Sequence, residues 1–421
     1  MTAPTLDADA LAAAPAVDEQ RLWQRLMDIA RFGATPRGGV NRQAFSAEDA
    51  EARRQMAAWA GDLGLTCATD AIGNLYLRRA GRDAEAAPVM TGSHLDSQPT
   101  GGKFDGAYGV MAGLEALQAI GQAGIETMRP IEVVAWSNEE GSRYQPGLMG
   151  SGVFSGAMQV TDLLPITDAE GVSVGSALED LFAATPGLPD RPAAPPAAYI
   201  EAHIEQGPIL EREERTIGVV GGVQGMRWFT IEVLGEAAHA GTTPRSARRD
   251  ALKAAARMVI ALEAAFTDAE DSVRFTIGRF EVEPNSPNTV PARVFFTIDF
   301  RHPEAAIIEA LCGRIESLCR EQAEGYPITV TQISGVPPRV FDPAVVETVR
   351  AAATQLELPK RDIMSGAGHD AMNMVSLCPT GMIFVPCEAG ISHNEAENAR
   401  PEDLAAGARV LAASLVALAN A

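Results

Sequence analysis

The sequence predicts an α/β protein in which a compact α+β module interrupts a domain built on a mixed sheet. Short apolar strand segments alternate with amphipathic helical segments over residues 20–136, and this alternation resumes over residues 343–386. Residues 226–334, between these stretches, show a different order of strands and helices. A chain of 421 residues is also longer than one simple core usually accommodates, so two domains are expected.

The α/β stretches contain clear helix and strand signals. Ser46 precedes Glu48 and Asp49, which is the pattern of a capped helix start. Residues 185–198 are rich in proline and alanine and are expected to form a surface connection. The expected elements are helices over residues 20–31, 46–63, 107–121 and 343–356 and strands over residues 74–78, 88–93, 131–136 and 380–386.

The inserted module has the order β-α-β-β-α-β, which is that of a ferredoxin-like fold. We place the insertion at residues 218–334 and the surrounding α/β domain at residues 19–217 and 335–421. The expected elements of the insertion are strands over residues 226–234, 273–282, 292–300 and 328–334 and helices over residues 248–266 and 304–322.

The N-terminal segment and the cysteines bear on cellular location. Residues 1–18 are rich in alanine, but Asp7 and Asp9 interrupt them and no basic segment leads, which predicts a flexible tail rather than a signal peptide. No apolar run approaches the ~20 residues that a membrane-spanning helix needs. Five scattered cysteines, odd in number, favour reduced thiols in a cytoplasmic protein.

The charge balance disfavours some partners. The chain has 34 Lys and Arg residues against 55 Asp and Glu residues, which gives a formal net charge of −21. Such an acidic surface repels phosphate backbones and anionic membranes, so we expect neither a nucleic-acid nor a membrane partner. It does not attract a small anionic substrate either. Any such substrate must therefore be held by a local positive group.

Two neighbouring segments carry candidate metal ligands. His94 and Asp96 lie two residues apart at the end of an apolar strand, so both face the same side and Asp96 can accept a hydrogen bond from the imidazole. Asp105 lies in the glycine-rich segment GGKFDG, which lacks the Lys-Ser/Thr ending of a phosphate-binding loop and suits a bridging carboxylate. Taken alone, His94 fits a buried, hydrogen-bonded histidine equally well, and Asp105 fits a cap or a turn.

Glu139 and Glu140 are adjacent at the end of another apolar strand. Like charges in such a place repel each other unless a cation neutralises them. One carboxylate can then bind a metal while the other stays free as a general base. In isolation, the pair is better explained as an exposed acidic loop.

Two more histidines have similar surroundings. His203 lies in the segment EAHIEQGP, and His393 lies in SHNEAE, which follows an apolar strand. Three histidines and several carboxylates at strand ends of one α/β domain combine nitrogen and oxygen donors, which suits zinc or a similar divalent ion. Separate structural explanations do not account for the whole set.

The sequence resembles the peptidase M20 superfamily. The blocks that carry this resemblance are, in order, GSHLDS, GGKFDGAYGV, EEGSRY, EAHIEQGP, AHAGTTP and SHNEAE. Ordered blocks are far more specific than any single motif, and the similarity runs from Arg21 to the C-terminus. Within the superfamily, the chain is most similar to the branch of allantoate amidohydrolases, N-carbamoyl-L-amino acid hydrolases and β-ureidopropionases.

This resemblance implies a metallohydrolase catalytic domain with two divalent metal ions about 3.5 Å apart. By analogy with the family, His94 and His203 hold one ion, Glu140 and His393 hold the other, and Asp105 bridges both. Zinc is the expected metal, and manganese, cobalt and nickel share such ligands.

The resemblance also implies an activity, the hydrolysis of an N-carbamoyl (ureido) amino acid to the amino acid, carbon dioxide and ammonia. Glu139 would be the general base, and Asp96 would orient His94. A histidine at position 203 points to the amidohydrolase branch, because the related peptidases usually have a carboxylate there.

The inserted module would serve in dimerisation and as a lid, so a homodimer is expected. In the family, the residues that match His239 and Asn288 are contributed across the dimer and hold the substrate or the oxyanion. Arg301 would clamp the substrate carboxylate, because a guanidinium binds a carboxylate bidentately. The implied substrate-binding residues are His239, Asn288, Arg301, Gln206, Gly366 and Ala367.

One residue departs from the family pattern. Arg245 follows AHAGTTP where an apolar residue, often methionine, is expected. The substrate therefore stays open among α-carbamoyl, β-carbamoyl and allantoate-like acids. Three alternatives remain: a dipeptidase or aminoacylase of the same superfamily, a non-catalytic binding protein that kept the fold, and a phosphate- or nucleotide-binding α/β protein. The intact Glu139 disfavours the second, and the acidic charge disfavours the third.

Overall fold

The computed structural model describes residues 6–192, 194–269 and 272–421. The chain divides into two compact units. Unit 1 comprises Met1–Gly221 and Val340–Ala421, and unit 2 comprises Gly222–Arg339. Unit 2 therefore begins and ends a few residues later along the chain than the insertion expected at residues 218–334.

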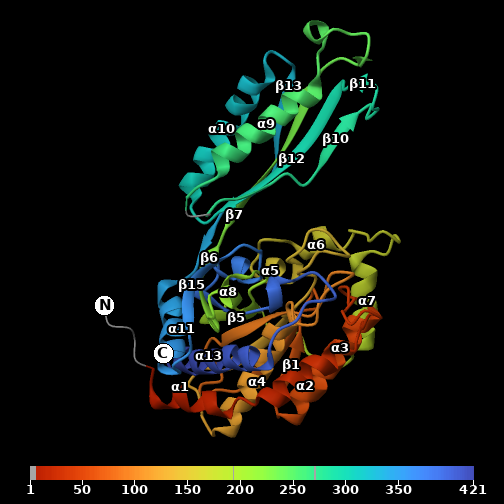
Figure 1. The fold of residues 1–421 in the computed structure, drawn as a ribbon. Coiled ribbons are helices and arrows are strands. Elements are labelled where there is room, and N and C mark those ends of the chain that lie inside the picture. Colours follow the sequence, from red (N-terminus) through yellow and green to blue (C-terminus); the bar gives the residue numbers. More distant parts are fainter. Residues whose placement is uncertain (1–5, 193, 270–271) are drawn as a thin grey trace. The chain divides into compact units, whose positions relative to one another are not determined.

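Unit 1 is built on a nine-stranded sheet with the strand order β1-β2-β4-β3-β5-β16-β6-β14, and β15 pairs with β6 (Figure 1). The central strands β4, β3, β5 and β16 are parallel, whereas β2 and β6 pair antiparallel to their neighbours. The sheet is therefore mixed, as predicted. The strands are β1 (Thr66–Thr69), β2 (Leu75–Arg79), β3 (Val89–His94), β4 (Ile131–Trp136), β5 (Ala198–Ile204), β6 (Ile217–Val223), β14 (Arg339–Val340), β15 (Lys360–Ser365) and β16 (Thr380–Val385).

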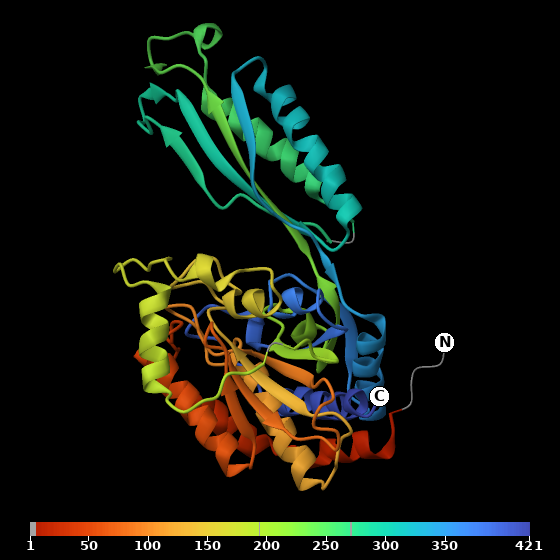
Figure 2. The ribbon, with the colours of Figure 1, turned by 180° about the vertical axis from the view of Figure 1, so that it is seen from behind.

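Helices cover both faces of this sheet (Figures 1 and 2). α4 and α13 pack on one face, and α5 and α12 contact the strands from the other. Every residue of β3, β4, β5 and β16 is buried as a result, which agrees with their largely apolar sequences. The helices of unit 1 are α1 (Ala8–Ala13), α2 (Glu19–Ile29), α3 (Ala47–Asp62), α4 (Ala107–Gln122), α5 (Met149–Phe154), α6 (Val160–Leu163), α7 (Val174–Ala184), α8 (Ile209–Arg212), α11 (Pro343–Gln355), α12 (Ala371–Met374) and α13 (Pro401–Ala419).

The N-terminal segment differs from the flexible tail expected over residues 1–18. Asp7 caps α1 by accepting a hydrogen bond from the N–H of Ala10. Ala10 and Ala13 are fully buried, and α1 packs against α13. The prediction is wrong for residues 7–18, because small alanine side chains allow this helix to approach α13 closely. Residues 1–5 lie outside the described part of the chain.

Unit 2 has a sheet with the order β10-β12-β7-β13, covered on one face by α9 and α10. Phe229, Ile231 and Val233 of β7 alternate toward the helices and are buried with Phe296 and Phe300 of β12. The strands are β7 (Gly225–Leu234), β8 (Ala238–His239), β9 (Arg274–Thr276), β10 (Phe280–Glu283), β11 (Thr289–Val290), β12 (Arg293–His302) and β13 (Ile328–Val336), and the helices are α9 (Ala251–Phe266) and α10 (Ala305–Ala323).

The main elements follow the predicted ferredoxin-like order, with two differences: β8 and β11 form a small separate sheet, and the second expected strand is divided. The single strand expected over residues 273–282 consists of the two short strands β9 and β10, which pair with successive parts of β12. The edge of the sheet is therefore interrupted at residues 277–279. None of the described helices combines the length and the apolar character that a bilayer crossing requires.

Candidate metal centre and active site

The candidate ligands converge at the carboxyl ends of the parallel strands of unit 1. His94 ends β3, His203 lies near the end of β5, and Glu140 follows β4. His393 lies on the loop after β16, and Asp105 lies just before α4. Parallel strands end at the same edge of a sheet, so segments far apart in the sequence meet there.

The carboxylate of Asp105 lies between the histidines. Its Oδ1 is 3.2 Å from Nε2 of His203 and 3.9 Å from Nε2 of His94. Its Oδ2 is 3.3 Å from Nε2 of His393, which lies 3.4 Å from Oε2 of Glu140. Two groups of potential ligand atoms, each within 4.8 Å of one another, therefore share Asp105: one with His94 and His203, the other with Glu140 and His393.

The backbone, rather than the Asp96 carboxylate, orients the ring of His94. Nδ1 of His94 lies 2.9 Å from the carbonyl oxygen of Asp96 and 3.9 Å from its carboxylate. That carboxylate instead accepts hydrogen bonds from the N–H groups of Glu139 and Glu140, both at 3.2 Å. The expected role of the Asp96 side chain is thus corrected: it holds the segment that carries the two glutamates.

The second buried histidine is fixed in a similar way. Nδ1 of His203 lies 2.9 Å from the carbonyl oxygen of Ile204, so its Nε2 faces Asp105. His94 and His203 are almost fully buried, whereas the side chain of His393 is 51% exposed. The centre is therefore open to solvent on the His393 side.

The titratable groups of this centre have shifted pKa values. Burial, followed by the repulsion of neighbouring carboxylates, raises the pKa of Glu139 well above its usual value and that of Glu140 to about 8. Burial alone would lower the pKa of His203, but its hydrogen bond to Asp105 raises it to about 9. The hydrogen bond to Asp105 likewise raises the pKa of His393 to about 9. Bound divalent ions would compensate the carboxylates that cluster here and would favour the deprotonated form of each ligand.

The two adjacent glutamates have different surroundings. The carboxylate of Glu140 accepts hydrogen bonds from the N–H of Gln98 at 3.2 Å and from its side-chain amide at 2.8 Å. Oε2 of Glu139 instead lies 3.5 Å from Nε2 of His94. The two carboxylates therefore face different neighbours, which suits a division between metal binding and proton transfer.

The glycines of the loop that carries Asp105 let its backbone lie very close to neighbouring side chains. Gly106 has a φ of 65°, and a Cβ there would lie 2.3 Å from the ring of His94. Gly102 packs so tightly on Glu397 that a Cβ would lie 2.0 Å from Oε1 of that residue. The glycines thus allow the segment that carries Asp105 to lie directly against its neighbours, and this explains the loop without a bound phosphate.

Several residues that touch this centre were not predicted, among them Ser392, Glu397 and Gln98. The hydroxyl of Ser392 donates to Oδ2 of Asp105 at 2.8 Å, and Glu397 accepts from the N–H of Asp105 at 3.0 Å. Gln98 binds Glu140 as described above. Ser392 and Glu397 belong to the SHNEAE block around His393, so the signal was present in the sequence.

The remaining predicted residues of unit 1 are Gln206, which contacts Asp105, and Gly366 and Ala367, which lie on a loop. The side-chain amide of Gln206 donates to Oδ2 of Asp105 at 2.9 Å. Gly366 and Ala367 lie on the loop after β15, where the N–H of Ala367 donates to the hydroxyl of Ser365 at 3.1 Å. The same loop reaches His203 through His369, whose ring centroid lies 4.5 Å away.

The predicted residues of unit 2 fall into two places within that unit. His239 on β8 pairs with Thr289 on β11, and the N–H of Ala240 donates to the carbonyl of Asn288 at 2.9 Å, so His239 and Asn288 lie together. Arg301 lies on β12 and forms an ion pair with Asp299 at 2.9 Å.

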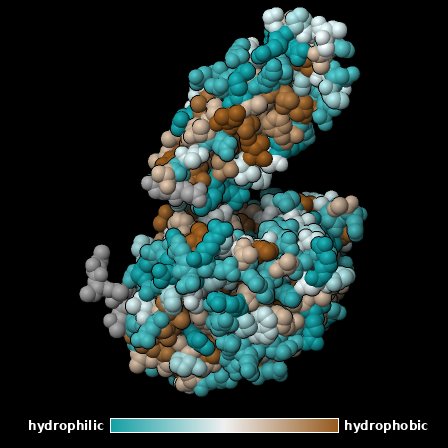
Figure 3. Space-filling view, viewed as in Figure 1, coloured by the Kyte–Doolittle hydropathy of each residue, from teal (hydrophilic) through white to brown (hydrophobic). Residues whose placement is uncertain are grey.

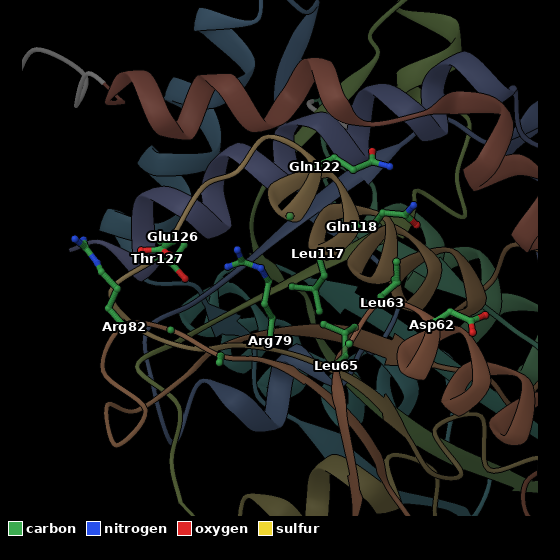
Figure 4. Close-up of a pocket in the computed structure, with 14 residues that line it drawn as sticks. Asp62, Leu63, Leu65, Arg79, Arg82, Leu117, Gln118, Gln122, Glu126 and Thr127 are labelled. Carbon is green, nitrogen blue, oxygen red and sulfur yellow. The ribbon is translucent and has the colours of Figure 1, made fainter.

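A cavity of about 700 Å³ in unit 1 lies elsewhere. Figure 4 shows Arg79 near the middle of its lining, with Glu126 and Thr127 on one side and Leu65 and Leu117 on the other. Its lining includes none of the residues of the candidate metal centre. This cavity therefore gives no support for an active site there, whereas the ligand geometry indicates a candidate site at the metal centre.

The fold and the paired clusters define a metal-dependent hydrolase. The chain belongs to peptidase family M20/M25/M40, whose model matches residues 90–417. This confirms the resemblance noted from the sequence.

Known relatives lie in the amidohydrolase branch. An N-carbamoyl-L-amino-acid amidohydrolase of Rhizobium meliloti is 41% identical over 397 residues, which cover 94% of this chain and 95% of that protein. An allantoate amidohydrolase of Escherichia coli (strain K12) is 35% identical over 96% of this chain and 98% of that protein. A crystal structure of an amidase of the hydantoinase/carbamoylase family from Burkholderia multivorans has a TM-score of 0.92 and 47% identity, and the match covers 96% of this chain and 98% of that one.

Proposed function

We propose that this protein hydrolyses the C–N bond of an N-carbamoyl amino acid, adding water to give the free amino acid and carbamate, which decomposes to carbon dioxide and ammonia. The observation that carries the proposal is the position of Asp105, shared between two clusters, with Glu139 beside them. The relative from Rhizobium meliloti supports the carbamoyl substrate, and the one from Escherichia coli keeps allantoate as an alternative.

The donor set fits two divalent ions. We assign His94 and His203 to one ion, Glu140 and His393 to the other, and Asp105 to both, because each group joins imidazole nitrogen with carboxylate oxygen. Zinc suits these donors best, and manganese, cobalt and nickel also accept them. Ions bound here would lower the pKa of a coordinated water toward neutrality and polarise the ureido carbonyl.

Glu139 is the proposed general base. Its carboxylate faces the cluster, and its side chain is only 12% exposed. Burial raises its pKa, so it is suited to accept a proton from the attacking water and to return it to the leaving nitrogen. Asp96 assists by holding the backbone of Glu139 and Glu140.

Substrate recognition is assigned by the family resemblance. Arg301 would bind the carboxylate, and His239 with Asn288 would hold the carbonyl oxygen as charge develops on it. Gln206, Gly366 and Ala367 are proposed to line the same substrate. Arg301 supplies the local positive group that a chain with a net charge of −21 needs for an anionic ligand.

We also propose a homodimer that forms through unit 2 and acts in the cytoplasm. Figure 3 shows apolar residues on the surface of unit 2. The large apolar residues exposed there include Trp228, Leu252, Ile260, Phe280 and Ile333, and exposed apolar surface favours association. All five cysteines are free thiols, which agrees with a reducing compartment.

The test is a substrate panel with the zinc- or manganese-loaded protein. N-carbamoyl-α-amino acids, N-carbamoyl-β-alanine and allantoate are compared with N-acetyl amino acids and a dipeptide, and ammonia and free amino acid are measured together. We expect equal amounts of the two products from a carbamoyl acid. Faster cleavage of the dipeptide or the acetyl derivative would assign the protein to the peptidases or aminoacylases, and two bound ions without any turnover would indicate a binding protein.

A further inference from the structure

Glu397 is a buried carboxylate that the proposed reaction does not use. It is 3% exposed and lies four residues after His393 on the same turn, where its N–H donates to the carbonyl of Asn394 at 3.0 Å. Its Oε1 accepts hydrogen bonds from the N–H groups of Phe104 at 2.9 Å and Asp105 at 3.0 Å. Glu397 therefore joins two segments that lie almost 300 residues apart and that each carry a candidate metal ligand.

The other carboxylate oxygen of Glu397, Oε2, is linked to Asp105 through the hydroxyl of Ser392. The hydroxyl of Ser392 lies 3.1 Å from Oε2 of Glu397 and 2.8 Å from Oδ2 of Asp105, so its proton can serve either carboxylate. Gln206 donates to Ser392 at 3.2 Å as well as to Asp105. The backbone of Asp105 and its carboxylate are thus both tied to the turn that carries His393.

The glycine-rich loop is shaped around this carboxylate. A Cβ on Gly102 would lie 2.0 Å from Oε1 and 2.1 Å from Cδ of Glu397. Any larger residue at position 102 would displace the carboxylate from the two N–H groups that it accepts. Gly102 and Glu397 therefore form one interlocking contact, contributed by two blocks of the sequence.

We propose that Glu397 is a positioning residue for the metal centre, which holds Asp105 in the orientation that lets its two oxygens serve both clusters. This inference rests on the proposed metal centre and deepens it, because nothing in the reaction itself calls for a carboxylate at position 397. Hydrogen bonds to metal-ligating residues hold these residues in the orientation that metal binding requires. Loss of such hydrogen bonds typically weakens metal binding about 10–100-fold.

The experiment measures zinc binding without substrate. Purified full-length protein is stripped with a chelator and titrated with Zn²⁺ against a chromophoric competitor, which gives the dissociation constants of both ions. We expect Glu397→Ala to weaken zinc binding about 10–100-fold. Glu397→Gln should restore binding close to that of the unmodified protein, because its amide oxygen can still accept from the N–H groups of Phe104 and Asp105.

A matched control separates positioning from general destabilisation. Asp70 is a half-buried carboxylate between β1 and β2 that also accepts two backbone N–H groups, those of Ile72 and Asn74, and one hydroxyl, that of Tyr76. Asp70→Ala should lower the unfolding temperature of the metal-free protein and leave zinc affinity unchanged. Equal loss of zinc affinity in Asp70→Ala and Glu397→Ala would overturn the proposal.

Gly102→Ala provides a second variant should Glu397→Ala fail to fold. It keeps the carboxylate but pushes it away, so zinc binding should weaken, and the effects of Gly102→Ala and Glu397→Ala should be less than additive when combined. Zinc binding as tight as in the unmodified protein, in Glu397→Ala or in Gly102→Ala, would refute the positioning role. An unmodified protein that bound no zinc, manganese, cobalt or nickel would instead refute the metal centre itself.

Discussion

Asp105 faces His203 with one carboxylate oxygen, at 3.2 Å, and His393 with the other, at 3.3 Å. This relationship makes Asp105 common to both candidate clusters, whereas each histidine belongs to one side of the carboxylate. Loss of Asp105 should therefore weaken the binding of both ions, whereas loss of one histidine should weaken the binding of only one ion.

Asp105→Ala should consequently abolish tight binding of both ions, while His393→Ala should weaken one ion and leave the other bound. Metal content after dialysis, measured by mass spectrometry, tests this difference. Stoichiometries of about zero and one per subunit are expected. Two retained ions in Asp105→Ala would contradict the shared role.

Glu139→Gln should keep both ions and lose turnover by at least about 10²-fold, because an amide cannot accept the proton of the attacking water. Metal content and kcat are measured on the same preparation. The matched control is Glu140→Gln, which should lose metal as well as activity. A fully active Glu139→Gln would exclude Glu139 as the base.

Asp96→Ala removes the acceptor for the N–H groups of Glu139 and Glu140 while leaving the backbone carbonyl that binds His94. We expect kcat to fall and the metal ion proposed to bind Glu140 to be held less tightly, while the proposed site of His94 and His203 stays occupied. Selective loss of the ion at His94 would instead restore the role first expected for the Asp96 side chain.

Zinc binding should release protons at neutral pH. The pKa values of His203 and His393 in the metal-free protein are raised to about 9 through Asp105, so both rings are largely protonated at pH 7 and must lose a proton to bind metal. Zinc affinity should therefore increase as the pH is raised towards about 9 and decrease as the pH is lowered. Calorimetry in buffers of different ionisation enthalpy measures the protons released, and a value of zero at pH 7 would contradict this prediction.

Arg301→Ala should raise KM for carboxylate-bearing substrates and leave zinc binding unchanged, because Arg301 is proposed to bind the substrate and lies outside both candidate metal clusters. Arg301→Lys keeps the charge but loses the bidentate geometry, so an intermediate KM is expected. Initial rates over a range of carbamoyl amino acid concentrations test both variants. An unchanged KM in Arg301→Ala would remove its role in binding the carboxylate.

The sequence places most of the candidate metal ligands at the ends of apolar segments and Asp105 in a glycine-rich loop. β3, β4 and β16 are visible in the sequence as apolar segments, and a parallel sheet brings the ends of such strands together, whereas β5 was not among the predicted strands. The family resemblance, rather than the spacing, divides the ligands between two ions.

Other features depend on tertiary contacts that no local pattern reports. The two-residue spacing of His94 and Asp96 does not reveal whether a carbonyl or a carboxylate meets the ring. The contact between Glu397 and Asp105 joins residues 292 positions apart, so it could be read only from the folded chain. α13 was missed because almost every side of it is buried, which removes the amphipathic contrast that marks a surface helix.

The packing of α1 against α13 makes the first and last helices of unit 1 neighbours. The fold of unit 1 therefore depends more on the contact between these two helices than on their order along the chain. A circularly permuted chain, with a linker between them and new ends opened in an exposed loop, should keep the same core, whereas deletion of α1 would leave an uncovered apolar stripe along α13.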